Sequence, residues 1–231
     1  MDFIYNGVLQ GIDLIFSGDE AILSAVKLTL ELTALSMCVS LFIGLPLGII
    51  LGYFDFPMKR ILRTIVDTCL SLPTVVVGLI VYAFISNAGP LGRHRLLFTI
   101  PGMAIGQTIL ALPIIIALTA NSIESLDKRL RLTLLTLGAG KLSAAVTTLW
   151  EARYQVIAAA VTACGRITAE VGVSMMLGGN IKWRTRTITT AITLETNKGE
   201  FAAGIALGVI LLLIAFTLNT ILAFVKKRGE Q

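Results

Sequence analysis

Charged residues are scarce in this sequence of 231 residues, and their scarcity limits the classes of protein that it can encode. Only 14% of the residues are Asp, Glu, Lys or Arg, whereas 55% are hydrophobic and the mean hydropathy is +0.86. Soluble domains carry about 25% charged residues. The shortage of charge therefore excludes an ordinary soluble domain and indicates a protein that crosses a membrane several times.

Histidine and cysteine are also rare, which leaves few groups for metal binding or catalysis. The chain has a single histidine, His94, and its three cysteines fall in three different apolar stretches: Cys38, Cys69 and Cys164. We interpret the cysteines as small apolar side chains. An HExxH motif, a Gly-x-Ser-x-Gly elbow and a pair of intramembrane carboxylates are all missing from the sequence. We therefore expect no catalytic site, no metal site and no cofactor in this chain.

Long apolar stretches account for most of the sequence. A membrane-spanning helix needs roughly 20 apolar residues, and five stretches meet this requirement: Thr29–Tyr53, Thr64–Ser86, Leu97–Ala120, Gln155–Gly178 and Phe201–Val225. They leave no room for a separate folded domain. The expected fold is an all-α, polytopic membrane helix bundle of about five transmembrane helices, with residues 1–231 as one transmembrane domain.

Residues 1–28 precede the first apolar stretch and are expected to form an outer interfacial segment. They lack the basic region and the cleavage site of a signal peptide. One face of a helix would carry four apolar residues, namely Ile4, Val8, Ile12 and Ile15. The sequence Ser17-Gly18-Asp19-Glu20 then predicts a turn and a cap for the next helix.

The distribution of basic residues predicts the orientation in the membrane. Most of them follow the first, third and fifth stretches: Lys59, Arg60, Arg63, Lys128, Arg129, Arg131, Lys141, Arg153, Lys226, Lys227 and Arg228. Cytoplasmic loops are enriched in Lys and Arg. We therefore expect a multi-pass protein of the cell (inner, cytoplasmic) membrane with its N-terminus outside and its C-terminus in the cytoplasm. The net charge of +5 reflects these loops, and no nucleic-acid partner is expected.

Residues 121–153 are the longest polar interruption between apolar stretches. One face of a helix there would carry four leucines at four- and three-residue spacing: Leu126, Leu130, Leu134 and Leu137. The glycines of Gly138-Ala139-Gly140 then break the helix, and a second short helix is expected from Lys141 to Trp150. Two helices joined by a turn on one side of the bilayer are suited to docking a soluble partner. Residues 121–153 are therefore predicted to form a cytoplasmic coupling loop.

The sequence GAGKLS around Lys141 superficially resembles a nucleotide-binding loop. That motif needs a glycine five residues before the Gly-Lys pair and Ser or Thr directly after it, but Leu135 and Leu142 occupy these positions. ATP that drives this protein must therefore be hydrolysed by another chain, and this chain is not expected to be an enzyme.

The fourth apolar stretch contains two charged residues, Arg166 and Glu170, one helical turn apart within GRITAEVG. A single charge at the centre of a spanning helix costs about 2.5–3.5 kcal/mol on insertion scales, so both residues must face the protein interior or a water-filled path. One interpretation is that they line the route or gate of a transported anion; the other is a structural ion pair. Pro73 and Pro113 interrupt two other stretches and are expected to kink them, as in a bundle that flexes.

Five segments of this sequence together resemble permeases of ABC importers. Gly138 takes the glycine position of the family's cytoplasmic loop, although Leu132-Thr133-Leu134 and Thr148–Glu151 depart from the family's EAA and I-x-L-P sequences. The remaining segments resemble permeases of the molybdate and tungstate type, the last being most similar to the tungstate type: LSLPTVVVGL (70–79), GQTILALPIIIAL (106–118), GRITAEVGVSMMLGGNI (165–181) and TRTITTAITLETNKGEF (185–201).

The resemblance implies a type I ABC importer permease-like fold and a non-catalytic subunit. Its partners would be a second copy of itself, cytoplasmic ABC ATPase subunits, an extracytoplasmic oxyanion-binding protein and the lipid bilayer. The cargo would be a tetrahedral oxyanion, with tungstate favoured over molybdate. The alternative is a secondary transporter or membrane scaffold without an ATPase partner.

Two sets of site residues follow from these expectations. Coupling to the ATPase is expected at Leu134, Gly138, Ala139, Gly140, Lys141, Leu142, Ser143 and Ala144. The translocation path or gate is expected at Arg166, Glu170, Pro73 and Pro113.

Overall fold

The computed structural model describes residues 9, 13, 16–126 and 128–229. Within these residues the chain is almost entirely helical, and no strand occurs among them. The elements in chain order are α2 (Glu20–Tyr53), α3 (Lys59–Leu70), α4 (Thr74–Ile85), η1 (Gly92–His94), α5 (Ile100–Glu124), α6 (Lys128–Thr136), α7 (Lys141–Glu151), α8 (Arg153–Thr168), α9 (Gly172–Gly178), α10 (Ile188–Lys198) and α11 (Phe201–Gly229). The expected all-α class is confirmed for the described part of the chain.

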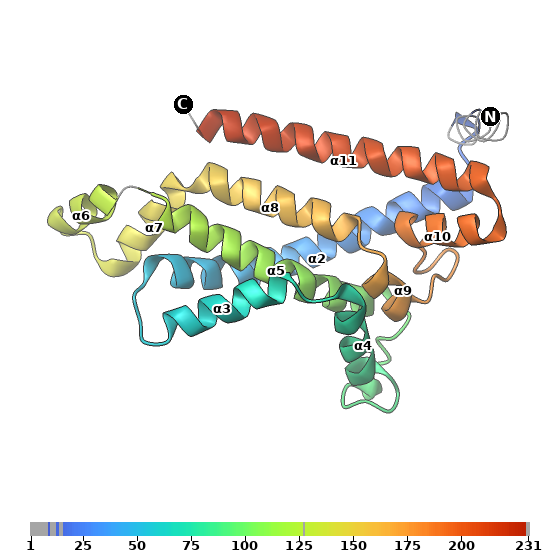
Figure 1. Cartoon of the computed structure of the whole chain (residues 1–231), viewed down its shortest axis with the longest axis horizontal. Coiled ribbons are helices and arrows are strands. Elements are labelled where there is room, and N and C mark those ends of the chain that lie inside the picture. Colours follow the sequence, from blue (N-terminus) through green and yellow to red (C-terminus); the bar gives the residue numbers. More distant parts are fainter. Residues whose placement is uncertain (1–8, 10–12, 14–15, 127, 230–231) are drawn as a thin grey trace.

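The long helices lie side by side along the long axis of the molecule (Figure 1). The α2 helix packs along α5, α8 packs on α5, and α11 packs on α8. Figure 1 places α6 and α7 at one end of the molecule and α9 and α10 toward the other. The C-terminal end of α11 lies at the same end as α6 and α7.

Within the described residues, three helices are long and apolar enough to cross a membrane unbroken: α2, α5 and α11. Two further pairs pass the same test only as bent units, α3 with α4 at 101° and α8 with α9 at 60°. By length and composition, the described residues therefore provide three candidate spans, or up to five if each bent pair is one span. The second and fourth apolar stretches, expected as continuous spans, are in fact broken.

The break between α3 and α4 has a cause in the sequence. Pro73 is the N-cap residue of α4 and has extended backbone angles. Proline has no N–H for a helix and disfavours helical angles in the residue before it. The α3 helix therefore ends at Leu70, and the chain turns at residues 71–73 before α4 begins.

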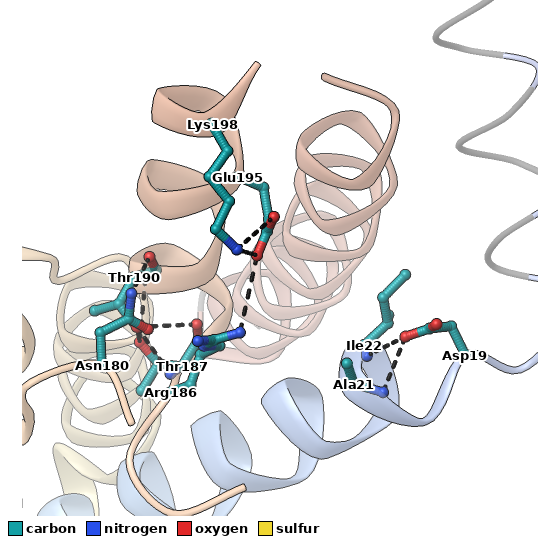
Figure 2. Close-up of polar contacts among 9 residues, drawn as sticks. All are labelled: Asp19, Ala21, Ile22, Asn180, Arg186, Thr187, Thr190, Glu195 and Lys198. Carbon is teal, nitrogen blue, oxygen red and sulfur yellow. Dashed lines mark hydrogen bonds and ion pairs between the residues drawn. The ribbon is translucent and has the colours of Figure 1, made fainter. Parts of the chain in front are cut away.

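The first span is longer than expected because α2 begins at Glu20, within the predicted outer segment. Asp19 is the N-cap residue, and its Oδ1 accepts hydrogen bonds from the N–H groups of Ala21 and Ile22 at 2.9 and 3.0 Å (Figure 2). These bonds satisfy two of the free donors at the helix start. The predicted cap is confirmed, while the amphipathic helix expected over residues 4–15 falls almost entirely outside the described residues.

The α10 helix lies between α9 and α11 and is fixed at both ends. Thr187 and Thr190 form a capping box at its start (Figure 2). Glu195 forms ion pairs with Arg186 at 3.8 Å and with Lys198 at 3.2 Å. Because Arg186 precedes the helix and Glu195 lies within it, the pair holds the incoming chain against α10 (Figure 2).

Glycines bring α2 and α5 into close contact. A Cβ atom on Gly48 would lie 2.7 Å from Thr119 Cβ, and one on Gly52 would lie 2.9 Å from Ala120 Cα. These distances are shorter than any carbon–carbon contact that packing tolerates, so only glycine fits at these two positions. Small residues four apart let membrane helices approach in this way.

We predict that Gly48→Ala lowers the thermal midpoint of the purified protein in detergent, because the added methyl group must displace Thr119 or separate the helices. Overpacking of this kind costs about 1–3 kcal/mol. The matched control is Gly208→Ala in α11, where an added Cβ meets no atom within 4 Å. Equal midpoints for the two variants would contradict the close contact.

Candidate docking surface and translocation path

The segment after α5 folds as two short helices joined by a glycine turn, as predicted. Gly138 has a φ of +78°, a left-handed conformation that strains any residue with a side chain. The N–H of Ala139 donates to the carbonyl of Leu134 at 3.0 Å, which closes the end of α6. Gly140 is then the N-cap residue of α7.

One face of α7 is buried against the rest of the bundle. Ala144 is 0% exposed and packs in a cluster that includes Tyr53 of α2 and Ile123 of α5. Ala145 and Thr148 are buried on the same face. These small side chains let α7 lie close against the ends of α2 and α5. Ala144, one of the residues expected at the ATPase-coupling site, therefore lies on the face of α7 that packs against the bundle.

The opposite face of α7 exposes large apolar side chains. Leu142, Val146 and Trp150 are 77%, 59% and 70% exposed, and their four-residue spacing aligns them along one side of the helix. Leu137, in the turn before α7, is 78% exposed. We call Leu142, Val146 and Trp150 the α7 ridge. Neither Val146 nor Trp150 was among the residues expected at the coupling site.

The other residues expected to couple to the ATPase occupy several positions in this segment. Gly138, Ala139 and Gly140 form the turn, and Ser143 is exposed on α7. Leu134 packs inward against the cluster that contains Ala144. Lys141 begins α7, but its side chain lies outside what the structure describes.

An ion-pair cluster joins the start of α3 to the end of α5, directly before α6. Lys59 and Arg63 both pair with Glu124, at 3.1 and 3.4 Å. Arg63 also donates a hydrogen bond to the side-chain oxygen of Asn121. Partly exposed pairs of this kind contribute at most about 1 kcal/mol each. Their effect is chiefly to fix the position of the helix end from which the docking segment departs.

The break between α8 and α9 contains the intramembrane ion pair. Arg166 Nη1 lies 2.8 Å from Glu170 Oε2, so the predicted pair is formed. Glu170 is only 4% exposed, whereas the Arg166 side chain is 49% exposed. The other carboxylate oxygen of Glu170 accepts a hydrogen bond from the N–H of Val173 at 3.3 Å, and its backbone carbonyl accepts one from Thr189 of α10 at 3.0 Å. Glu170 therefore caps α9 and binds Arg166 at the same time.

Gln107 of α5 completes the interactions at this break. Its side chain is buried, and its Nε2 donates to the carbonyl of Ile167 and to Ser174 Oγ, both at 3.4 Å. Its Oε1 accepts a hydrogen bond from Ser36 of α2 at 3.2 Å. A broken helix leaves carbonyls without partners, which is costly in a membrane unless side chains replace the missing bonds. Nothing in the sequence distinguished this glutamine from other polar residues in the spans.

Pro73 and Pro113, the two prolines expected at the path or gate, occupy different positions in their helices. Pro73 caps α4 at the 101° bend, and Pro113 is buried within α5, which continues without a break from Ile100 to Glu124. Proline has no N–H, so neither residue offers an anion a hydrogen bond. Of the four residues expected at the path or gate, only Arg166 and Glu170 are charged, and they form an ion pair at the break between α8 and α9.

A bundle with broken spans, a charged pair at one break and a projecting apolar ridge defines a membrane permease on which a soluble partner can dock. The chain belongs to the family of binding-protein-dependent transport system inner membrane components, and the match covers residues 44–230.

Two curated relatives match nearly the whole chain. The tungstate uptake system permease protein TupB of Campylobacter jejuni is 52% identical over 221 residues, covering 96% of this chain and 92% of that protein. The protein of the same name from Peptoclostridium acidaminophilum is 33% identical over 222 residues, covering 96% and 97%. The resemblance to oxyanion-importer permeases is thereby confirmed.

A solved structure shows the same fold. It is that of a bacterial alginate ABC transporter in complex with a periplasmic protein bound to an alginate pentasaccharide. The match has a TM-score of 0.70 and 20% identity, and it covers 92% of this chain and 80% of that one. The expected type I importer permease fold is confirmed.

The unequal burial of the ion pair gives a prediction. Arg166→Met leaves a buried carboxylate without its partner, at a cost of about 3–5 kcal/mol, whereas Glu170→Gln leaves a half-exposed guanidinium and a side chain that still caps α9. We expect Arg166→Met to have the lower thermal midpoint and folded yield, and the double variant to recover part of the loss. The measurement is a melting curve of each purified variant in detergent. Equal losses in the two single variants would show that the pair is not asymmetric.

Proposed function

We propose that this chain is the non-catalytic permease subunit of an ABC importer that carries a tetrahedral oxyanion into the cell. Tungstate is the favoured cargo, ahead of molybdate. Both relatives described above are tungstate uptake permease proteins, and each aligns with nearly the full length of this chain. ATP is hydrolysed by a separate cytoplasmic subunit that docks on the α7 ridge. The exposure of this ridge is the observation that carries the proposal.

The α7 ridge has the chemistry of a docking surface. Leu142, Val146 and Trp150 are exposed on a helix whose other face is fixed to the bundle through Ala144 and Ala145. Tryptophan and large apolar side chains dominate the energetics of protein interfaces when a partner covers them. Because that buried face packs against the ends of α2 and α5, we propose that a displacement of the ridge also displaces the bundle.

A second copy of the chain supplies the rest of the pathway in this proposal. Three to five crossings are too few to enclose a route within one chain. Arg166 is half exposed at the break of a spanning pair, where contact with lipid is unfavourable. A water-filled path between two copies removes this cost, because Arg166 then faces water or an anion.

The proposed orientation has the α7 end in the cytoplasm. Basic residues of the last turn of α11 lie at this end with α6 and α7 (Figure 1): Lys226, Lys227 and Arg228. The N-terminus is then outside and the C-terminus in the cytoplasm. Residues 121–153 act as the coupling loop, and residues 1–231 act as one membrane domain of the cytoplasmic membrane.

The outer end carries a basic surface suited to an oxyanion-binding protein. Its exposed cations, Arg93, Arg95, Lys182 and Arg184, come from two loops that a hydrogen bond between Phe98 N and Leu177 O joins at 2.8 Å. None of these four side chains forms an ion pair with another described residue. Such a surface favours an acidic partner face and attracts anions.

The α7 ridge gives the test of the proposed coupling. Val146→Glu places a carboxylate in the apolar contact, so we expect the permease to fold and insert normally but to lose the ATPase subunit on co-purification. Ala144→Glu instead buries a charge against Tyr53 and Ile123 and should prevent folding.

The conservative control is Val146→Leu, which keeps the ridge apolar and should retain the ATPase. ATPase stimulation by loaded binding protein and oxyanion uptake are measured on the same preparations. Normal stimulation and uptake in Val146→Glu would remove the ridge from the coupling role.

A further inference from the structure

A polar stripe runs along α8 on the side that the bundle leaves open. Gln155, Thr162 and Arg166 are all exposed, and spacings of seven and four residues place them on one face of the helix. The helix rise puts Gln155 about 16 Å from Arg166 along the axis. Exposed polar groups over this length are unfavourable against lipid, so the stripe indicates contact with water.

At its cytoplasmic end the stripe opens into a pocket of about 480 Å³ between α5, α8 and the end of α11. Seven of its described lining residues carry polar groups: Asn121, Ser122, Ser125, Tyr154, Gln155, Thr162 and Lys226. One water occupies about 30 Å³ in the liquid. The pocket therefore has room for a tetrahedral oxyanion together with several waters.

Some of these polar groups already donate hydrogen bonds to backbone carbonyls nearby in the chain. Ser122, Ser125 and Thr162 donate to carbonyls of Leu118, Ser122 and Ala158 at 2.7, 2.9 and 2.8 Å. Two other lining side chains, the amide of Gln155 and the ammonium of Lys226, bond to no other described residue.

Asn121 adds a donor of fixed orientation. Its side-chain oxygen accepts the hydrogen bond from Arg63. An asparagine amide has one accepting oxygen and one donating nitrogen. Because Arg63 occupies the oxygen, the nitrogen is left to donate toward the pocket that Asn121 lines.

The charges around the pocket favour an anion. No Asp or Glu is among the described residues that line it, and Lys226 supplies a positive charge. The nearest carboxylate along α5, Glu124, is paired with Lys59 and Arg63. Two amide donors, from Asn121 and Gln155, and the ammonium of Lys226 thus line a cavity that has no carboxylate among its described lining residues.

We infer that this pocket binds a tetrahedral oxyanion on the cytoplasmic side of Arg166, as the last site that the cargo occupies before release. The inference rests on the proposed function, which supplies the cargo. A phosphate group of an anionic lipid has the same shape and charge, so the experiment must separate these two sources.

The experiment uses the permease–ATPase complex in nanodiscs of zwitterionic lipid, without binding protein and without ATP. Tungstate binding is measured by calorimetry on the wild type, Lys226→Gln and Gln155→Leu. We expect each variant to bind about tenfold more weakly, because each loses a hydrogen bond to a charged ligand. The matched control is Lys227→Gln: Lys227 is the next basic residue of α11 but lines a different pocket, and its affinity should equal that of the wild type.

Three results overturn the inference. The first is an unchanged tungstate affinity in both Lys226→Gln and Gln155→Leu, and the second is an equal loss in Lys227→Gln. The third is no tungstate binding in zwitterionic discs combined with retention of anionic lipid that Lys226→Gln abolishes, which would make the pocket a lipid site.

Uptake into proteoliposomes with binding protein, ATPase and ATP separates this inference from the proposed function. Wild-type uptake of tungstate together with wild-type rates in both pocket variants overturns the pocket alone. A wild-type complex that takes up no tetrahedral oxyanion overturns the proposed function itself.

Discussion

The structure depends on satisfying the backbone of a spanning helix that is broken inside the membrane. Where α8 gives way to α9, carbonyls and N–H groups lose their helical partners, and lipid offers no replacement. Gln107 from α5, Thr189 from α10 and the Glu170 side chain replace the missing bonds. A break held by side chains from two other helices couples those helices to any change in its geometry.

The same break lies at the end of α8, and the start of α8 adjoins the helix that carries the α7 ridge. Ala152 is both the C-cap residue of α7 and the N-cap residue of α8, so no linker separates the two helices. The buried face of α7 fixes it to α2 and α5 through Tyr53 and Ile123. In the proposed function, a displacement of the α7 ridge by the ATPase subunit is transmitted along α8 to the Arg166–Glu170 pair. We propose that this connection links ATP hydrolysis on the partner chain to the opening of the path in the permease.

The sequence predicted the features that local patterns encode. Leucine spacing and the glycines at 138 and 140 predicted two short helices and their turn, and Asp19 predicted the start of a helix. Other features depend on contacts between distant segments. The pairing of Glu124 with Lys59 and Arg63 and the bonds of Gln107 join residues far apart in the chain. The 101° bend had a signal in Pro73, but proline sets only the place of a break, while packing sets its angle.

Local sequence patterns also could not predict which face of α7 packs against the bundle. Both of its faces carry apolar residues, Ala144 and Ala145 on one and Leu142 and Val146 on the other, and only the fold decides which face is covered. Small side chains allow a close approach to the bundle, which is why the alanine face is buried. The larger side chains, Leu142 and Val146, therefore remain on the exposed face.

The central claim is that this chain moves an oxyanion only when a separate subunit hydrolyses ATP. The most direct measurement is tungstate uptake by proteoliposomes that contain the purified permease, with the ATPase subunit, the binding protein and ATP added or omitted one at a time. The account predicts uptake only when all of them are present. Uptake by the permease alone, driven by an ion gradient and indifferent to ATP, would contradict it and identify a secondary transporter.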